Sequence, residues 1–170
     1  MKSLSLTIAA LFFFTGFSAA QTVQPVFYIE RSKNSNKVYY EARIDHKGQI
    51  DMNDPVHIYW ILWAQDSTGH KQEELSLIEK NMAYGLKMLP NKNKKYFTAS
   101  LNAFPDRPIV FCLLNNKAVA EVIINGHNSY IEKVYINARE TKMFPKVNYI
   151  EIFGRDVKTK EARYEKIKPR

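Results

Sequence analysis

Apolar and polar residues alternate with a period of two along most of the chain after residue 21. In KVYYEARID, residues 37–45, every second residue from Val38 onward is apolar or aromatic, as in a half-buried β-strand. Similar segments recur at short intervals, at residues 26–31, 37–45, 56–64, 95–102, 108–115, 117–124, 130–137, 147–154 and 162–167. Short strands at this spacing predict an all-β domain, a mainly antiparallel sandwich or barrel of about nine strands.

Two features refine the predicted sheet. The pairs Asn115-Asn116 and Asn125-Gly126 lie between predicted strands, and both residue types tolerate the positive φ of tight hairpin turns. Segment 56–64 is apolar or aromatic on both faces, which predicts a central strand that is covered on both sides.

One segment departs from the period of two. In LSLIEKNMAYGLKMLP, residues 75–90, the apolar residues recur at helical spacing, and Ser76 with Glu79 has the spacing of a capping box. Pro90 prevents a helix from continuing. We therefore predict one short helix near residues 76–88, with its apolar stripe over a sheet face or a barrel mouth.

The amino terminus has the layout of a secretory signal peptide. Lys2 precedes an apolar stretch at residues 4–17, and the small residues Ser18-Ala19-Ala20 follow it. The stretch is shorter than the roughly 20 residues that span a bilayer, so an uncleaved anchor is less favoured. We predict a signal peptide at 1–20 and a single β-rich domain at 21–170, in the periplasm or outside the cell, without a transmembrane segment.

The charge balance is basic, with 25 Lys and Arg against 17 Asp and Glu and a net charge of +8. An excess of cations favours association with acidic partners, although solubility alone is a sufficient explanation. No nucleic-acid-binding motif appears, and nucleic acid is not an expected partner of an exported protein. Lys87, Lys92, Lys94 and Lys95 form a basic group that fits a solvated loop better than a specific anionic surface.

Compact catalytic and metal-binding motifs are absent from the sequence. The single cysteine, Cys112, lies in an apolar strand, so it is predicted to be a small core residue and no disulfide can form within the chain. The four histidines are widely separated, without the spacing of a metal site. No catalytic residue, metal or cofactor is therefore predicted.

Four segments together resemble a known family. FYIERSKNSNKVYYEARID, PVHIYWI, EKNMAYG and YIEIFGRDVKTKE are similar to the domain-of-unknown-function family numbered 4833, whose members are small exported bacterial proteins. The resemblance covers nearly all of residues 21–170 and implies one domain. The family has no assigned activity, so the resemblance implies no catalytic residues.

The leading hypothesis is a non-enzymatic domain that binds a small or envelope-derived ligand, anionic or amphipathic in character. The aromatic residues of the predicted strands would mostly fill the core, but some of them would form a pocket if they line an open barrel end beneath the helix. The candidate binding residues are Arg31, Lys33, Asn34, His57, Trp60 and Arg107. In the loop after Arg31, asparagines explain a turn, whereas the cations Arg31 and Lys33 are left unexplained by turn geometry.

Two alternatives remain open. The first is a hydrolase whose site is assembled only in three dimensions, with Glu30, Arg31, His57, Glu79 and Arg107 as candidates. The second is a structural or interaction protein that pairs through an exposed sheet edge.

Overall fold

The computed structural model describes residues 22–90, 95–139 and 146–168. The predicted signal peptide at 1–20 lies outside these residues, as do Lys92 and Lys94 of the basic group. The strands are β1 (Thr22–Arg31), β2 (Asn34–Ile44), β3 (Val56–Ile61), β4 (Gln72–Glu74), β5 (Leu86–Leu89), β6 (Tyr96–Leu101), β7 (Phe104–Leu114), β8 (Lys117–Ile124), β9 (His127–Arg139), β10 (Lys146–Asp156) and β11 (Ala162–Ile167). The helical elements are α1 (Leu77–Glu79) and a π-helical segment, η1 (Lys80–Tyr84). The all-β prediction with one short helix is confirmed.

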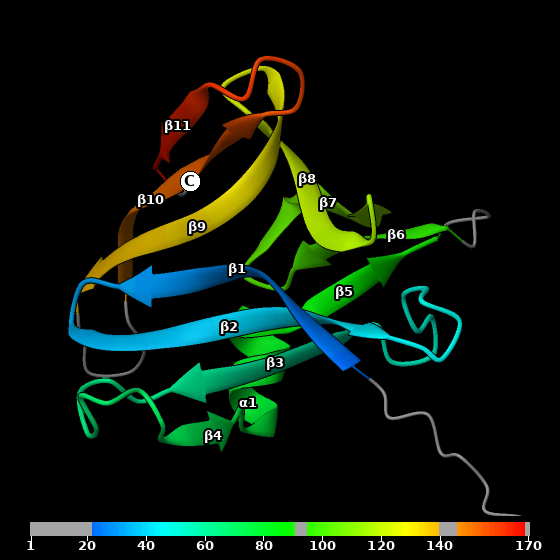
Figure 1. Ribbon diagram of the computed structural model, residues 1–170. Coiled ribbons are helices and arrows are strands. Elements are labelled where there is room, and N and C mark those ends of the chain that lie inside the picture. Colours follow the sequence, from blue (N-terminus) through cyan, green and yellow to red (C-terminus); the bar gives the residue numbers. More distant parts are fainter. Residues whose placement is uncertain (1–21, 91–94, 140–145, 169–170) are drawn as a thin grey trace, which may run out of the picture.

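The strands form one sheet that curls into a half-barrel around the helical segment (Figure 1). Its hydrogen-bonded order is β4-β3-β2-β1-β9-β8-β7-β6-β5, and β10 pairs with both β9 and β11. All the strand pairs are antiparallel except β1 with β9. Of the two predicted architectures, sandwich or barrel, the half-barrel corresponds to the second.

Strand β9 connects the two halves of the sheet. Its first residues pair with β8, and residues farther along pair in parallel with β1, while β10 follows it on the other side. Gln24 bridges the place where β1 approaches β8: its side-chain oxygen accepts from the Ala118 N–H, and its amide donates to the Asn116 carbonyl. The backbone groups of Asn116 and Ala118 are therefore paired at the place where β1 and β8 separate.

The inner face of the sheet carries the hydrophobic core. Phe27, Tyr40, Phe97 and Phe111 are nearly or fully buried, and Phe27 stacks on Tyr40 with ring centroids 4.3 Å apart. The strand alternation places the neighbouring residues on the outer face, where Tyr39 stacks between two other tyrosines. Of the aromatic residues of β1–β3, Phe27, Tyr40 and Trp60 thus belong to the core, whereas the tyrosines stacked with Tyr39 lie outside it.

The helical segment begins where the sequence predicts and ends earlier. Ser76 caps α1, and the reciprocal contacts of a capping box with Glu79 are both present. After η1 the backbone becomes extended at Gly85, and residues 86–89 form β5 rather than a last helical turn. Pairing of β5 with β6 satisfies backbone groups that a helix ending at Pro90 would leave free. Strand pairing therefore decides the structure of residues 86–89, although their apolar residues have helical spacing.

Nine of the eleven strands lie where the sequence predicts a strand. The two additional strands, β4 and β5, lie at the two ends of the strand order. Because β4 follows β3 in that order, β3 lies next to an edge strand, and the prediction of a central position is wrong. On the outer face, Tyr59 of β3 stacks on Tyr39 of β2 and on His57. Both hairpin predictions are confirmed, since Asn115, Asn116, Asn125 and Gly126 all have positive φ.

Among the described residues, no helix has the length and apolar character needed to cross a membrane.

Candidate functional site

A cavity of about 390 Å³ lies between the inner face of the sheet and the helical segment. Its wall is mainly aliphatic and comes from six strands: Ile29, Leu101, Ile109, Val122, Ile131, Val134, Ile136, Ala138, Val147, Ile150 and Ile152. Ile78, Met82 and Ala83 of the helical segment cover one side. The volume falls in the range of small-molecule pockets, roughly 300–1,000 Å³.

Two of the predicted binding residues, Arg31 and Arg107, lie on the wall of this cavity. The charge of Arg107 is paired within the fold: its guanidinium forms a two-pronged ion pair with Glu165, at 2.6 and 2.9 Å, and also donates to the Ile123 carbonyl. Hydrogen bonds from Arg107 lower the pKa of Glu165 and so keep it charged. Arg107 therefore ties β7 to β11 and has few donors left for a ligand.

Arg31 is held differently, between aromatic rings. Its guanidinium carbon lies 4.9 Å from the centre of the Trp60 ring and 5.9 Å from that of Tyr84. Its Nε is buried and has no hydrogen-bond partner. Among the described residues, no carboxylate lies within ion-pair distance, 4.0 Å, of this side chain. The structure thus brings the predicted residues Arg31 and Trp60 together and adds Tyr84.

Buried contacts fix this aromatic pair. The Trp60 and Tyr84 rings meet edge to face, with centroids 5.2 Å apart. The Tyr40 hydroxyl donates to the Tyr84 carbonyl at 2.7 Å, which anchors the end of η1 to β2. Burial raises the pKa of Tyr84, although the adjacent Arg31 guanidinium opposes that shift, so Tyr84 remains a neutral phenol at physiological pH.

Glu79 lies close enough to Arg31 to sense its charge but is committed to other partners. Its carboxylate accepts from the Ser76 N–H and hydroxyl, and from the Trp60 indole N–H at 3.1 Å. Burial would raise the pKa of Glu79, but the Ser76 and Trp60 hydrogen bonds and the Arg31 charge lower it on balance. Glu79 is therefore an ionised positioning group for the Trp60 ring and for the start of α1.

The predicted loop residues Lys33 and Asn34 take no part in the cavity wall. The Asn34 side chain accepts from the Asn36 N–H, which is a local turn contact, and Lys33 is exposed. The Asn36 side chain in turn accepts from the Ala64 N–H at 2.8 Å. The polar run after Arg31 is thus built as a hairpin, and Arg31 alone among its cations reaches the cavity wall.

His57 lies on the outer face of the sheet, away from the cavity. Its Nε2 is 2.7 Å from Glu74, and its Nδ1 is 3.8 Å from Glu41. The Tyr59 hydroxyl donates to Glu41, and burial followed by this contact raises the pKa of Tyr59. These side chains join β2, β3 and β4 in a cross-strand polar network, which separates His57 from Arg31 and Trp60.

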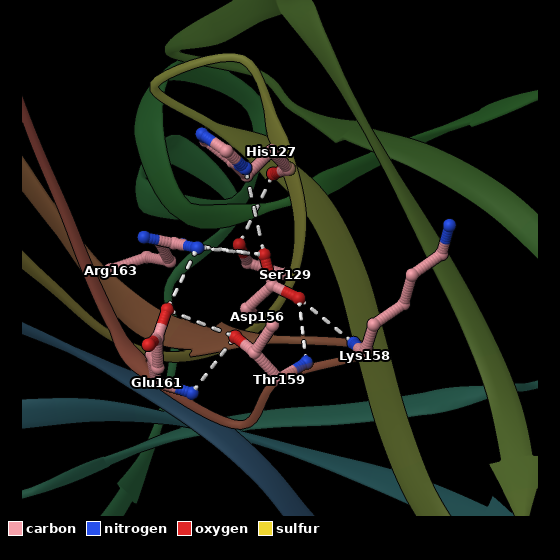
Figure 2. Close-up of polar contacts among 7 residues, drawn as sticks. All are labelled: His127, Ser129, Asp156, Lys158, Thr159, Glu161 and Arg163. Atoms are coloured by element: carbon pink, nitrogen blue, oxygen red, sulfur yellow. Dashed lines mark hydrogen bonds and ion pairs between the residues drawn. The ribbon is translucent and has the colours of Figure 1, made fainter.

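A second polar cluster surrounds the turn between β10 and β11 (Figure 2). Asp156 accepts from the backbone N–H groups of Lys158 and Thr159, and it pairs with Arg163 at 3.2 Å and with His127 at 3.6 Å. The backbone hydrogen bonds, followed by Arg163, lower the pKa of Asp156 to about 2. The cluster fastens the turn to the start of β9, which is a structural role.

No group of three His, Cys, Asp or Glu side chains among the described residues is arranged to hold a metal ion. Cys112 is partly buried, and burial followed by the nearby Glu121 carboxylate raises the pKa of its thiol, which disfavours the reactive thiolate.

The family profile described as "Domain of unknown function (DUF4833)" matches residues 27–166. This chain belongs to that family. The matched part contains Arg31, Trp60, Tyr84 and the whole aliphatic wall of the cavity, so the candidate site lies inside the DUF4833 domain. The comparisons with curated proteins and with solved structures return no match.

Sequence reasoning missed two parts of the site. Tyr84 is a buried core residue, and nothing in EKNMAYG indicates that its ring also lies beside Arg31. The aliphatic wall has no signal in the sequence, because inward-facing Ile and Val residues follow the same pattern whether they enclose a space or fill it.

Proposed function

We propose that this DUF4833 protein is exported and binds a small amphipathic ligand derived from the cell envelope, with the ligand's apolar part in the cavity. The observation that carries the proposal is the cavity of about 390 Å³ with an aliphatic wall. Small-molecule sites are concave and mostly apolar, with a few polar groups that orient the ligand. The aliphatic wall, with Arg31 and Arg107 as its cations, has this composition.

The helical segment provides a route into the cavity. Ile78 and Met82 line the cavity, yet they are 70% and 56% exposed, so the cavity wall reaches the molecular surface there. Leu77, beside them, is 77% exposed. Burial of apolar surface by a ligand or its alkyl chain would remove these groups from water, which contributes roughly 25 cal/mol per Å².

Export is supported by the signal-peptide pattern at residues 1–20, and it gives the chain access to envelope lipids and their fragments. An N-terminal sequence beginning near Gln21 on protein secreted by its native host would support this part. A retained Met1 on that protein would contradict it.

Occupation of the cavity is tested by titrating the protein with the neutral fluorescent probe N-phenyl-1-naphthylamine. We expect saturable binding of one probe per chain. Ala138→Phe places an aromatic ring on the cavity wall, and we expect it to weaken probe binding by at least about tenfold, which corresponds to roughly 1.4 kcal/mol.

The matched control is Ala162→Phe, the same change at an exposed position of β11 that does not line the cavity. It should leave probe binding unchanged. Equal weakening by both substitutions, or no saturable binding to the wild-type protein, would contradict the proposal. Circular dichroism of each variant checks that the β fold is retained.

The enzymatic alternative has weaker support. The cavity wall includes Arg31, Glu79 and Arg107, three of the predicted hydrolase residues, but His57 lies on the outer face. Glu79 is ionised and already accepts hydrogen bonds from Ser76 and Trp60, which suits neither a proton donor nor a free base.

A further inference from the structure

We propose that the cavity selects ligands with a singly charged carboxylate head, which the guanidinium of Arg31 binds while the alkyl chain lies along the aliphatic wall. This inference rests on the proposed function and adds the chemical class of the ligand: a long-chain monocarboxylic acid.

The two arginines on the wall differ in a way that identifies the head-group position. Arg107 is neutralised by its ion pair with Glu165 and also donates to the Ile123 carbonyl. Arg31 lines the same cavity, and among the described residues no carboxylate lies within 4.0 Å of its guanidinium. Arg31 is therefore the cation on this wall whose charge is left for a ligand to pair with.

The surroundings of Arg31 fix its position without neutralising its charge. Trp60 and Tyr84 approach the guanidinium at cation–π distances, 4.9 and 5.9 Å from the ring centres. Both rings attract the cation, and the Tyr84 hydroxyl also forms a hydrogen bond with it, but neither side chain carries the negative charge of a carboxylate. The Trp60 ring is itself held by its N–H bond to Glu79.

Binding a carboxylate here would remove an energetic cost. A buried donor without a partner is costly, and a partly buried cation gains most from an anion that it contacts directly. The planar guanidinium matches the two oxygens of a carboxylate in a two-pronged contact. The rest of the wall is aliphatic, so such a head needs an apolar tail to follow the cavity.

Glu79 limits the charge of the head group. It is ionised and near enough to Arg31 for the two charges to attract each other. A ligand at Arg31 therefore contacts the Arg31 cation and lies close to the Glu79 anion. A single negative charge is favoured there, because a phosphate monoester, with a charge of about −1.5 to −2 at pH 7, costs more to remove from water, and the nearby Glu79 charge weakens the attraction of Arg31 that would offset this cost.

The test is displacement of the neutral naphthylamine probe at pH 7.4 by three ligands with the same chain: dodecanoate, dodecyl phosphate and 1-dodecanol. We expect the wild-type protein to bind dodecanoate at least about tenfold more tightly than either of the others. Arg31→Met should weaken dodecanoate binding by about tenfold and change dodecanol binding by less than about twofold. The control Arg155→Met removes an exposed arginine that pairs with Glu132, and it should change neither.

Equal binding of dodecanoate and dodecanol to the wild-type protein would overturn the inference, and so would an equal loss of both in Arg31→Met. Tighter binding of dodecyl phosphate than of dodecanoate would overturn the assignment of a single charge. These comparisons on the wild-type protein stand even if Arg31→Met fails to fold. If the probe and dodecanol both fail to bind, the cavity proposal itself is contradicted, which distinguishes the two failures.

Discussion

At the residue scale, Asp156 links ionisation to stability of the fold. Its side chain is 10% exposed and accepts backbone hydrogen bonds from Lys158 and Thr159 (Figure 2). Because the native contacts lower its pKa from 3.8 to about 2, the charged form is favoured in the folded state. This stabilisation is complete above the ordinary pKa and is lost as the pH falls from about 4 to 2.

We therefore predict a pH-dependent effect of Asp156→Asn. The variant should unfold at lower urea concentration than the wild type at pH 6, and the difference in free energy of unfolding should shrink between about pH 4 and 2. Other carboxylates with lowered pKa values, such as Glu165, are common to both proteins, so their contributions cancel in the difference. A difference that stays constant or grows as the pH falls through this window would contradict the assignment.

At the residue scale, the sequence selects Arg31 and Trp60 as binding candidates, and the structure places them together, because Trp60 pairs with Val38 on β2 while Arg31 lies at the β1–β2 hairpin. His57 lies away from this pair because successive side chains of a strand point to opposite faces, and His57 and Trp60 are an odd number of residues apart. Binding by any of the three stays a prediction. Which face is inner depends on the curl of the whole sheet, which no local pattern specifies.

At the element scale, the β10 strand depends on a close approach to β9. A Cβ atom at Gly154 would lie 2.2 Å from the Tyr130 carbonyl oxygen and 2.8 Å from Cδ1 of Ile124. Gly154 also adjoins a register shift between β10 and β9. The absence of a side chain therefore lets the two strands stay paired through the irregularity.

We predict that Gly154→Ala destabilises the protein by about 1–3 kcal/mol, because the backbone oxygen of Tyr130 cannot move aside as a flexible side chain would. The comparison variant is Gly48→Ala, which has open space around it but a φ of +71°. Its cost should be about 1 kcal/mol, from the left-handed backbone alone. Chemical denaturation measures both, and a smaller loss at Gly154 than at Gly48 would contradict the crowding argument.

Edge strands bear on the hypothesis of an interaction through sheet edges. Strand β4 has three residues, two of them glutamates, and β5 has four residues that include Lys87. Short, charged edge strands resist pairing with another chain. Both edges escaped sequence prediction for a related reason: segments this short show too little alternation, and their pairing is decided by neighbouring strands.

At the scale of the whole molecule, the sequence predicts a sheet but not how the sheet curls. Nine strands follow from the period of two, because one face of each is buried on the core. The half-barrel depends on β9 pairing with β1, β8 and β10 at once, a set of contacts between distant parts of the chain. The cavity is a consequence of that curl, since one short helical segment does not fill the space inside the curled sheet.

The central claim is that this space holds the alkyl chain of an acidic ligand. The most direct measurement is a crystal structure of the chain grown with dodecanoate. We predict electron density for the alkyl chain of dodecanoate against Ile136 and Ile150, with its carboxylate in contact with Arg31. A cavity filled by rearranged Ile78 and Met82 side chains, or dodecanoate bound only on the outer face, would contradict the account.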